Sequence, residues 1–266
     1  RLDLNDLDKH KAGEGRFVFG VLDPAGNPME FTLIFEYALP ANSEQDVRAW
    51  GDAVHALQAL PFPSEAYNQA LQAITDRYAG RNAVPDMPNG SALIDIRTNE
   101  IALSQGREWQ LREFHISPTT GFLEPATLFQ TPDFSFNNSA LLGRFINANE
   151  ATILTEKHEA PLLFEGAPFQ AGAVFNNIDF WSAPGVTNPE ARHKFSLNTC
   201  NGCHGQETQT GFLHIQPRFP GQISALSGFL TGETVFDPVT GAERRLGDLK
   251  RRRQLLESVV CADEQP

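Results

Sequence analysis

Hydrophobic and polar residues alternate along the first part of the chain. In residues 29–37 every second side chain is apolar, and these side chains would share one face of a strand: Phe31, Leu33, Phe35 and Tyr37. A period of two is typical of a β-strand with one buried face, so this strand is predicted to be half-buried. Residues 16–23 form a similar run, and the cluster 24–28 between the runs has the Pro and Gly content of a turn. The pattern predicts a β-hairpin, preceded by an extended arm at residues 1–15.

Helical spacing replaces the alternation after residue 42. Ser43 is suited to cap a helix because its hydroxyl can accept a hydrogen bond from the first free backbone amides. The apolar residues that follow have the spacing of one helix face: Val47, Trp50, Val54, Leu57 and Leu60. A second helix is predicted to begin after Ser64 and to end near Gly80. We expect the two helices to pair and to lie on the sheet that contains the hairpin.

Strand patterns return after a linker rich in Pro, Gly and Asn at residues 82–90. Residues 92–97, 100–103 and 108–116 are predicted strands, with a short further strand at 123–128. The alternation slips at Arg112–Glu113, which predicts a β-bulge. Charged residues in these runs are expected to pair across the strands: Arg97, Glu100, Arg112 and Glu113.

The second half of the chain is less regular. A short helix is predicted at residues 139–147 and a basic helix at 246–260, while 149–190 carries aromatic residues without a period among many Pro and Gly. The pattern therefore predicts an α+β protein. Residues 1–148 would form a domain of antiparallel strands with a helix pair, and residues 149–266 a loop-rich region with short helices.

Charge and length exclude some classes of function. The 266 residues carry a formal net charge of −12, which argues against nucleic acid as a partner because phosphate contacts need a basic surface. The sequence contains no apolar run of about 18 residues, so no membrane span is predicted. It begins with Arg1 rather than Met, which is consistent with a processed protein.

Chemistry is concentrated in the segment Cys200-Asn-Gly-Cys203-His204. A C-x-x-C-H run is the attachment signature of c-type haem. The thiols of Cys200 and Cys203 would form thioethers with the two vinyl groups, and His204 would bind the iron. On a helix, positions i, i+3 and i+4 lie on one face, so the three side chains can meet one flat ring.

The segment Asn198–Gly205 (N-T-C-N-G-C-H-G) resembles the attachment site of c-type cytochromes and is similar to segments of uncharacterised exported bacterial proteins. The resemblance implies a periplasmic or extracellular protein that transfers electrons through one covalent haem and a redox partner protein. It is local, because c-type cytochromes have a distal Met downstream and no Met follows Cys203 here. His214 is therefore the expected sixth ligand, with His158 and Met87 in reserve.

Two other classes of function remain open. One is a haem enzyme of peroxidase or oxygenase type with an open distal site. The other is a structural or interaction protein in which the Cys/His group binds zinc or copper, or forms a disulfide. An odd number of cysteines leaves Cys261 over if the other two carry haem, and Cys261 is then expected to be unmodified and at least partly sheltered. No catalytic residue is assigned.

Overall fold

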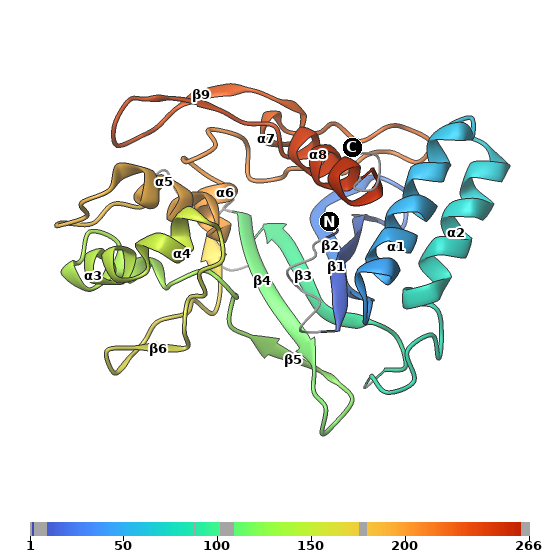
Figure 1. Ribbon diagram of the computed structural model, residues 1–266, viewed down its shortest axis with the longest axis horizontal. Helices are drawn as coiled ribbons and strands as arrows, with labels where there is room; N and C mark the ends of the chain where they lie inside the picture. Colours follow the sequence, from blue (N-terminus) through green and yellow to red (C-terminus); the bar gives the residue numbers. More distant parts are fainter. Residues whose placement is uncertain (1, 3–9, 88, 102–108, 176–179, 262–266) are drawn as a thin grey trace.

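A computed structural model of the chain describes residues 2, 10–87, 89–101, 109–175 and 180–261. Its centre is a six-stranded sheet in which each strand is antiparallel to its neighbours (Figure 1). Five strands follow one another across it: β1 (Lys11–Leu22), β2 (Pro28–Pro40), β3 (Leu93–Ile101), β4 (Trp109–Ile116) and β5 (Leu123–Ala126). The short strand β8 (Val174–Phe175) pairs with the beginning of β4, and β5 pairs with the end of β4. The predicted α+β class is confirmed.

The predicted hairpin is confirmed, with Phe17 opposite Phe35 in β1 and β2. Three details were wrong. Residues 11–15 belong to β1 rather than to an arm, and the two strands predicted at 92–97 and 100–103 are one strand through residue 101. No bulge interrupts β4 at Arg112–Glu113, because the β3–β4 register continues without a shift. Residues 102–108, in which two predicted strand ends fall, lie outside the described residues.

Two helices cover one face of this sheet, as the sequence predicted. They are α1 (Glu44–Ala56) and α2 (Glu65–Ala79), separated by a short 3₁₀ turn at Leu57–Ala59. Their first turns are capped by the hydroxyls of Ser43 and Ser64, which accept hydrogen bonds from the backbone amides of Asp46 and Tyr67. The caps define where each helix begins.

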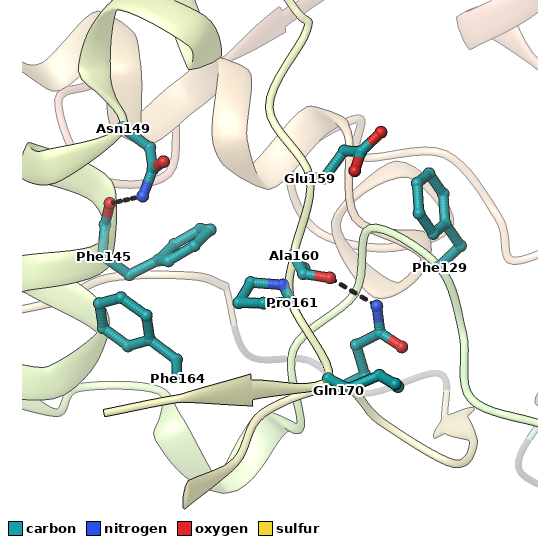
Figure 2. A pocket seen from close by; sticks show the side chains of 9 residues that line it. Phe129, Phe145, Asn149, Glu159, Ala160, Pro161, Phe164 and Gln170 are labelled. Carbon is teal, nitrogen blue, oxygen red and sulfur yellow. Dashed lines mark hydrogen bonds between the residues drawn. The ribbon is translucent and has the colours of Figure 1, made fainter. Parts of the chain in front are cut away.

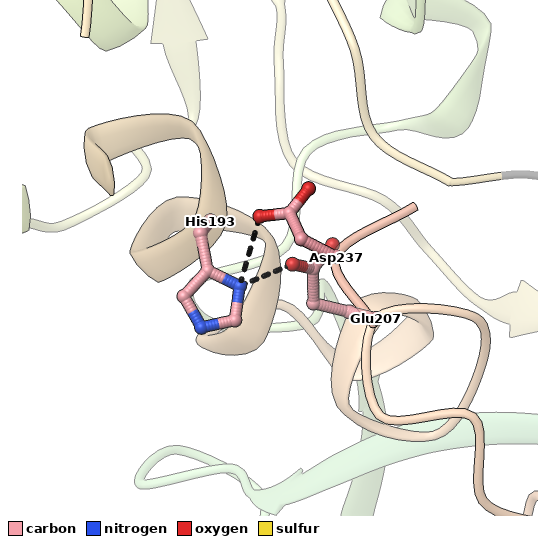
Figure 3. A group of neighbouring side chains, drawn as sticks. All are labelled: His193, Glu207 and Asp237. Atoms are coloured by element: carbon pink, nitrogen blue, oxygen red, sulfur yellow. Dashed lines mark hydrogen bonds and ion pairs between the residues drawn. The ribbon is translucent and has the colours of Figure 1, made fainter. Parts of the chain in front are cut away.

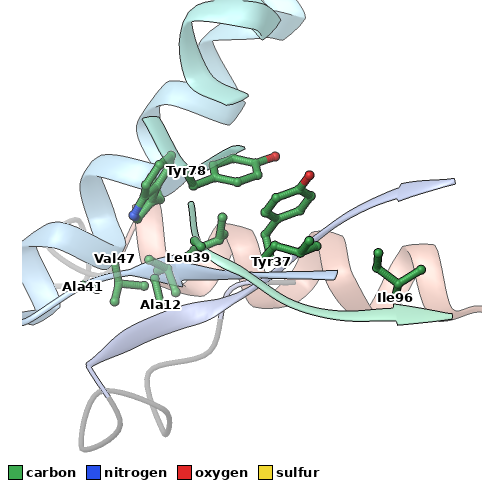
Figure 4. Close-up of a cluster of buried hydrophobic side chains, with 11 residues drawn as sticks. Ala12, Tyr37, Leu39, Ala41, Val47, Tyr78 and Ile96 are labelled. Carbon is green, nitrogen blue, oxygen red and sulfur yellow. The ribbon is translucent and has the colours of Figure 1, made fainter. Parts of the chain in front are cut away.

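An apolar cluster fills the space between these helices and the sheet (Figure 4). Trp50 of α1 and Tyr37 of β2 each pack edge-on against Tyr78 of α2, with ring centroids 5.7 and 5.3 Å apart. The indole Nε1 of Trp50 donates to the carbonyl of Pro40 over 2.8 Å, so its polar atom is satisfied inside the cluster.

The opposite face of the sheet is polar but is not exposed to solvent. Thr32, Glu36 and Asn99 are 2%, 1% and 3% exposed. The prediction of a half-buried β2 was therefore wrong, because the polar side of the strand is also covered. Leu111 on this face joins an apolar cluster with Phe212 and Leu213, so the C-terminal half of the chain supplies the cover.

The C-terminal half consists of short elements joined by irregular segments. Before the motif lie a 3₁₀ turn (Phe134–Phe136), α3 (Ala140–Ala148), α4 (Glu150–Leu154), β6 (Leu163–Phe164) and β7 (Ala167–Pro168). Around and after it lie α5 (Pro189–Leu197), α6 (Cys200–Cys203), α7 (Gly228–Thr231), β9 (Thr234–Phe236), β10 (Glu243–Arg245) and α8 (Asp248–Val260). No helix in the described ranges is long and apolar enough to cross a membrane.

This half is joined to the sheet at several places. Strand β8 pairs with β4. Helix α8 packs on α1, and its Val259 enters the apolar cluster between the helices and the sheet. Phe169 and Trp181 from the aperiodic segment join Phe145 and Phe195 in a second cluster, whereas Phe175 and Phe180 are exposed. The clustered residues fill a core because helices this short bury little surface on their own.

Candidate functional site

The motif occupies a helical turn of its own. Helix α5 ends at Leu197, and α6 begins again after Thr199, whose hydroxyl accepts a hydrogen bond from the amide of Gly202. His193 lies in α5 and does not share a helix with the motif, because the chain turns between α5 and α6. Within α6 the two cysteines are three residues apart, and His204 forms the C-terminal cap. The side chains that the sequence singled out are therefore on one turn.

The two residues between the cysteines are fixed by packing. A Cβ atom on Gly202 would lie 2.0 Å from the carbonyl oxygen of Ser196, so only glycine lets α6 approach the end of α5 this closely. The indole Nε1 of Trp181 donates to the hydroxyl of Thr199 over 2.8 Å and to the side-chain oxygen of Asn201 over 3.0 Å. These contacts hold α6 in place without using either thiol.

Both thiols of the motif are free and half-buried. Burial raises the pKa of Cys203 to about 12, with the neighbouring Cys200 as the next cause. Burial also raises the pKa of Cys200, although the Arg97 guanidinium partly opposes it. Reactive cysteine pairs need thiolate, and their pKa values are lowered. The raised pKa values therefore argue against a thiol–disulfide exchange site. Cys261, in contrast, is exposed, so the expectation that it is sheltered was wrong.

His204 is oriented through one ring nitrogen. Its Nδ1 is hydrogen-bonded to the carbonyl oxygen of Phe212, which requires the proton to be on Nδ1. Burial lowers the pKa of His204 to about 4, so the ring is neutral near pH 7 and Nε2 keeps its lone pair. A ring N–H donated to a backbone carbonyl is the usual support of a metal-binding histidine. His204 thus presents Nε2 in a fixed position, with a lone pair that can bind a metal ion.

His214 has a similar support on the next segment. Its Nδ1 is 2.8 Å from the hydroxyl of Ser227, and its Nε2 is 3.4 Å from the sulfur of Cys203. Burial, followed by repulsion from His204, lowers the pKa of His214 to about 3. A small antiparallel ladder holds it, because the amide of Ser227 donates to the His214 carbonyl and Ile215 pairs with Leu226.

The structure brings the four predicted site residues together, with distances that constrain what they could bind. The ring centroids of His204 and His214 are 4.3 Å apart. Metal–nitrogen bonds of about 2 Å would put two axial imidazoles on opposite faces of a porphyrin, with ring centres roughly 6 Å apart. Ligation of one haem iron by both rings therefore requires His214 to move away from His204.

The surroundings of the motif fit a porphyrin in chemical character. Cys200 packs against the apolar cluster that contains Leu111, Phe212 and Leu213. The half-buried guanidinium of Arg97 is close enough to affect the pKa of both Cys200 and His204, and it is held by Glu113 over 2.7 Å. Two thiols, one supported imidazole and an apolar wall are the groups that a c-type haem requires.

A second buried group of possible metal ligands lies nearby, and sequence reasoning missed it. In the described part of the chain, His193, Glu207 and Asp237 form the one set of three such residues whose ligand atoms are within 4.8 Å of one another (Figure 3). Arg192 binds both oxygens of Glu207, at 2.6 and 2.8 Å, and also Asp237 at 2.9 Å. A cation would have to displace this guanidinium, so the group is a structural clamp.

The clamp positions the motif. Glu207 comes three residues after His204, and Arg192 and His193 belong to the helix before it. Asp237 follows β9 directly, and Arg244 of β10 binds the same carboxylate at 2.9 Å. The only sequence signal for this network was an arginine beside a histidine shortly before the motif, and it does not identify the distant Asp237.

A hollow of about 510 Å³ lies in the C-terminal half (Figure 2). Its wall includes Phe145, Phe164 and Pro161, and polar groups at its edge bond to the chain. The amide of Asn149 donates to the carbonyl of Phe145 over 2.9 Å, and that of Gln170 donates to the carbonyl of Ala160 over 2.5 Å. These partners satisfy the two amides, and Glu159 adds a carboxylate to the wall.

Comparison with protein-family models, with curated proteins and with solved structures gave no match. The arguments about function therefore rest on the residues and on their geometry.

Proposed function

We propose that this chain is an exported electron-transfer protein that carries one covalently attached c-type haem. The observation that carries the proposal is the C-x-x-C-H turn in which His204 has its Nδ1 bonded to the Phe212 carbonyl. Cys200 and Cys203 would hold the haem and His204 would bind the iron. When bound, the haem supplies a one-electron carrier, and the protein sets its environment.

The state of the thiols suits covalent attachment. Each thiol would add across one vinyl double bond, with sulfur bonding to one carbon and the hydrogen going to the other. This addition needs no external oxidant, in contrast to disulfide formation. Cys200 and Cys203 are free and their pKa values are raised by burial, so neither is held as a thiolate by a neighbouring cation.

The periplasmic or extracellular location and a redox partner protein belong to the same proposal. They rest on the resemblance of the motif segment to exported c-type cytochromes. The acidic composition, with a net charge of −12, would favour a partner whose contact surface is basic.

The first test is the mass of the mature protein. The full chain is produced in a host competent for cytochrome maturation, and its intact mass is measured after denaturation. The mass should exceed the sequence mass by one haem, and the denatured protein should keep its colour. Cys200→Ala combined with Cys203→Ala should lose both. Cys261→Ala, the matched control, should keep both, since Cys261 is far along the chain and exposed. Colourless wild-type protein at the sequence mass would refute the proposal.

The second test concerns the sixth position on the iron, for which His214 remains our candidate. Its Nδ1 is bonded to the Ser227 hydroxyl, and its Nε2, which contacts the Cys203 sulfur at 3.4 Å, would bind iron once the ring moves away from His204. His214→Ala should convert a low-spin ferric spectrum to a high-spin one, and exogenous imidazole should reverse the change. The control is His55→Ala, on an exposed part of α1. If wild-type ferric protein is already high-spin and binds added ligands, the open-site enzyme is the better description.

One observation favours a different cofactor. The 3.4 Å between the Cys203 sulfur and the His214 Nε2 is close to the roughly 3.6 Å between sulfur and nitrogen ligands on a tetrahedral zinc ion. Zinc or copper on Cys203, His204 and His214 is therefore the second candidate. His204 would have to approach, because the three ligand atoms do not all lie within 4.8 Å in the described structure. Stoichiometric zinc or copper in colourless wild-type protein, lost in His214→Ala, would establish it.

A further inference from the structure

A cleft of about 290 Å³ lies beside the segment that carries His214. One wall is the hairpin of β1 and β2, and the other is the irregular segment from Ile215 to Ser224. The lining is mixed: Val18, Phe19, Leu22, Ile215, Pro217 and Pro220 are apolar, and Thr32, Gln216, Arg218 and Ser224 are polar. The ladder that holds His214 also fixes the second wall, because the amide of Gln216 donates to the Ala225 carbonyl.

One lining residue is buried and lacks a hydrogen-bond partner. Thr32 is 2% exposed, and its hydroxyl is not bonded to any group of the described protein. Its neighbour across the β2–β3 pair is Asn99, which is 3% exposed and whose side-chain oxygen also lacks a partner. Residues directly opposite in an antiparallel pair have side chains on the same face, about 5 Å apart. Thr32 lines the cleft, whereas Asn99 does not line it but lies beside Thr32 on the same face of the sheet.

These two groups define the polar atom of a ligand. The Asn99 oxygen can only accept a hydrogen bond, whereas the Thr32 hydroxyl can donate or accept. A hydroxyl group between them would donate to Asn99 and accept from Thr32, which a carbonyl or a methyl group cannot do. Leaving such groups unpaired in a buried position is unfavourable, because each has given up its hydrogen bond to water.

The size and lining of the cleft define the rest of the ligand. An apolar cavity of about 150 Å³ is sufficient for benzene, so 290 Å³ admits one substituted ring. We propose that this cleft binds a small phenolic molecule, with the ring between the hairpin and the 215–224 segment and the hydroxyl directed at Thr32 and Asn99. The proposal does not depend on haem at the neighbouring motif.

The test compares two ligands of one shape. Binding of phenol and of toluene to the purified full-length protein is measured by ligand-detected NMR and isothermal titration calorimetry. Phenol should bind about tenfold more tightly than toluene, because toluene leaves both polar groups unpaired. In Thr32→Val, phenol should lose this advantage of about tenfold, and toluene should bind no more weakly than it does to wild type.

Two variants make the result specific. Thr98→Val removes another buried, unpartnered hydroxyl, but Thr98 is opposite Leu33 and so faces the other side of the sheet. It should leave both affinities unchanged. Gly20→Val adds side-chain atoms to the cleft wall where a Cβ would already be 3.4 Å from Pro217, and it should abolish binding of both ligands.

Equal binding of phenol and toluene to wild-type protein would overturn the proposal, since the cleft would then be only an apolar depression. So would the absence of binding, which would mean that water satisfies Thr32. An effect of Thr98→Val as large as that of Thr32→Val would also refute it. The wild-type selectivity and Gly20→Val decide the question even if Thr32→Val does not fold.

Discussion

The two faces of the central sheet are built differently. The face under α1 and α2 carries aromatic and aliphatic side chains, and even the indole nitrogen of Trp50 has a partner at 2.8 Å. The face under the C-terminal half buries Glu36 and Arg97, and places an unpartnered Thr32 and a pair of thiols around them. Both faces are covered. The first also buries unpartnered oxygens of Thr98 and Glu100, but its cluster under the helices is apolar, whereas the second face carries ion pairs and two thiols.

The difference has an energetic side. Burial of apolar surface stabilises by about 25 cal/mol per Å², whereas burial of charge is favourable only with excellent pairing. Glu36 is partnered by Arg97 at 3.4 Å and Arg16 at 3.3 Å, which are long for charge-assisted contacts. Burial raises the pKa of Glu36 despite these partners. The binding role that we propose for the C-x-x-C-H turn therefore lies on the less favourably packed face.

The largest predicted effect is on the apolar face. Trp50→Ala removes a side chain that is 3% exposed and leaves a cavity between α1 and α2. It should lower the free energy of unfolding by about 3–5 kcal/mol. Urea denaturation followed by circular dichroism would measure the change. Val54→Ala on the same helix, where the side chain is 43% exposed, should change it by less than about 1 kcal/mol. Similar losses in both variants would mean that α1 does not pack as described.

A smaller effect of opposite sign is predicted on the polar face. Burial, and then the Glu113 carboxylate, raise the pKa of Asp95 from its ordinary value near 4 to about 6. The folded state therefore holds a proton that the unfolded state has released between pH 4 and 6. Stability from this group falls as pH rises through that range and is constant above it. Asp95→Asn should remove the penalty and raise the free energy of unfolding by about 1–3 kcal/mol at pH 8.

Urea titrations at pH 4.5 and pH 8 would test this prediction. The gain from Asp95→Asn should be complete at pH 8 and about a third as large at pH 4.5, where folded Asp95 is protonated while unfolded Asp95 is still mostly ionised. Asp52→Asn, on an exposed position of α1, serves as the control and should give equal stability changes at both values. A gain that does not depend on pH would show that Asp95 is not strained by charge, and that the contrast between the faces is weaker than proposed.

The sequence predicted the apolar face well because local signals determine it. Ser43 and Ser64 cap the helices as expected, and the period of two identified the residues of β2 that enter the core. Arg97 and Glu113 also pair across strands as predicted, at 2.7 Å. Each of these features depends on residues close in sequence or on adjacent strands.

The polar face could not be predicted in the same way. Alternation in β2 identified Thr32 and Glu36 as one face, but a polar face is usually solvated, and only the tertiary arrangement buries it. The clamp of Arg192 and Asp237 joins residues 45 positions apart. The motif itself was visible from spacing, whereas its support by Phe212 and Ser227 depends on loop geometry that carries no periodic signal.

The smallest predicted effect concerns His158, behind the motif. His158 is only 3% exposed, and neither of its ring nitrogens has a partner in the described protein. The centroid of its ring is 6.0 Å from that of Phe195. Burial lowers its pKa, so the ring is neutral near pH 7 and its unpaired nitrogens are a net penalty. His158→Leu, which keeps a similar volume, should raise the free energy of unfolding by about 1 kcal/mol at pH 7. The gain should grow below pH 6.5, because the unfolded wild type then gains a proton on His158 that the folded state does not. His55→Leu, at an exposed position, should show neither change.

If His158→Leu instead destabilises the mature protein or alters its ferric spectrum, the imidazole has a partner that ligand-free protein does not supply. His158 would then replace His214 as the candidate sixth ligand.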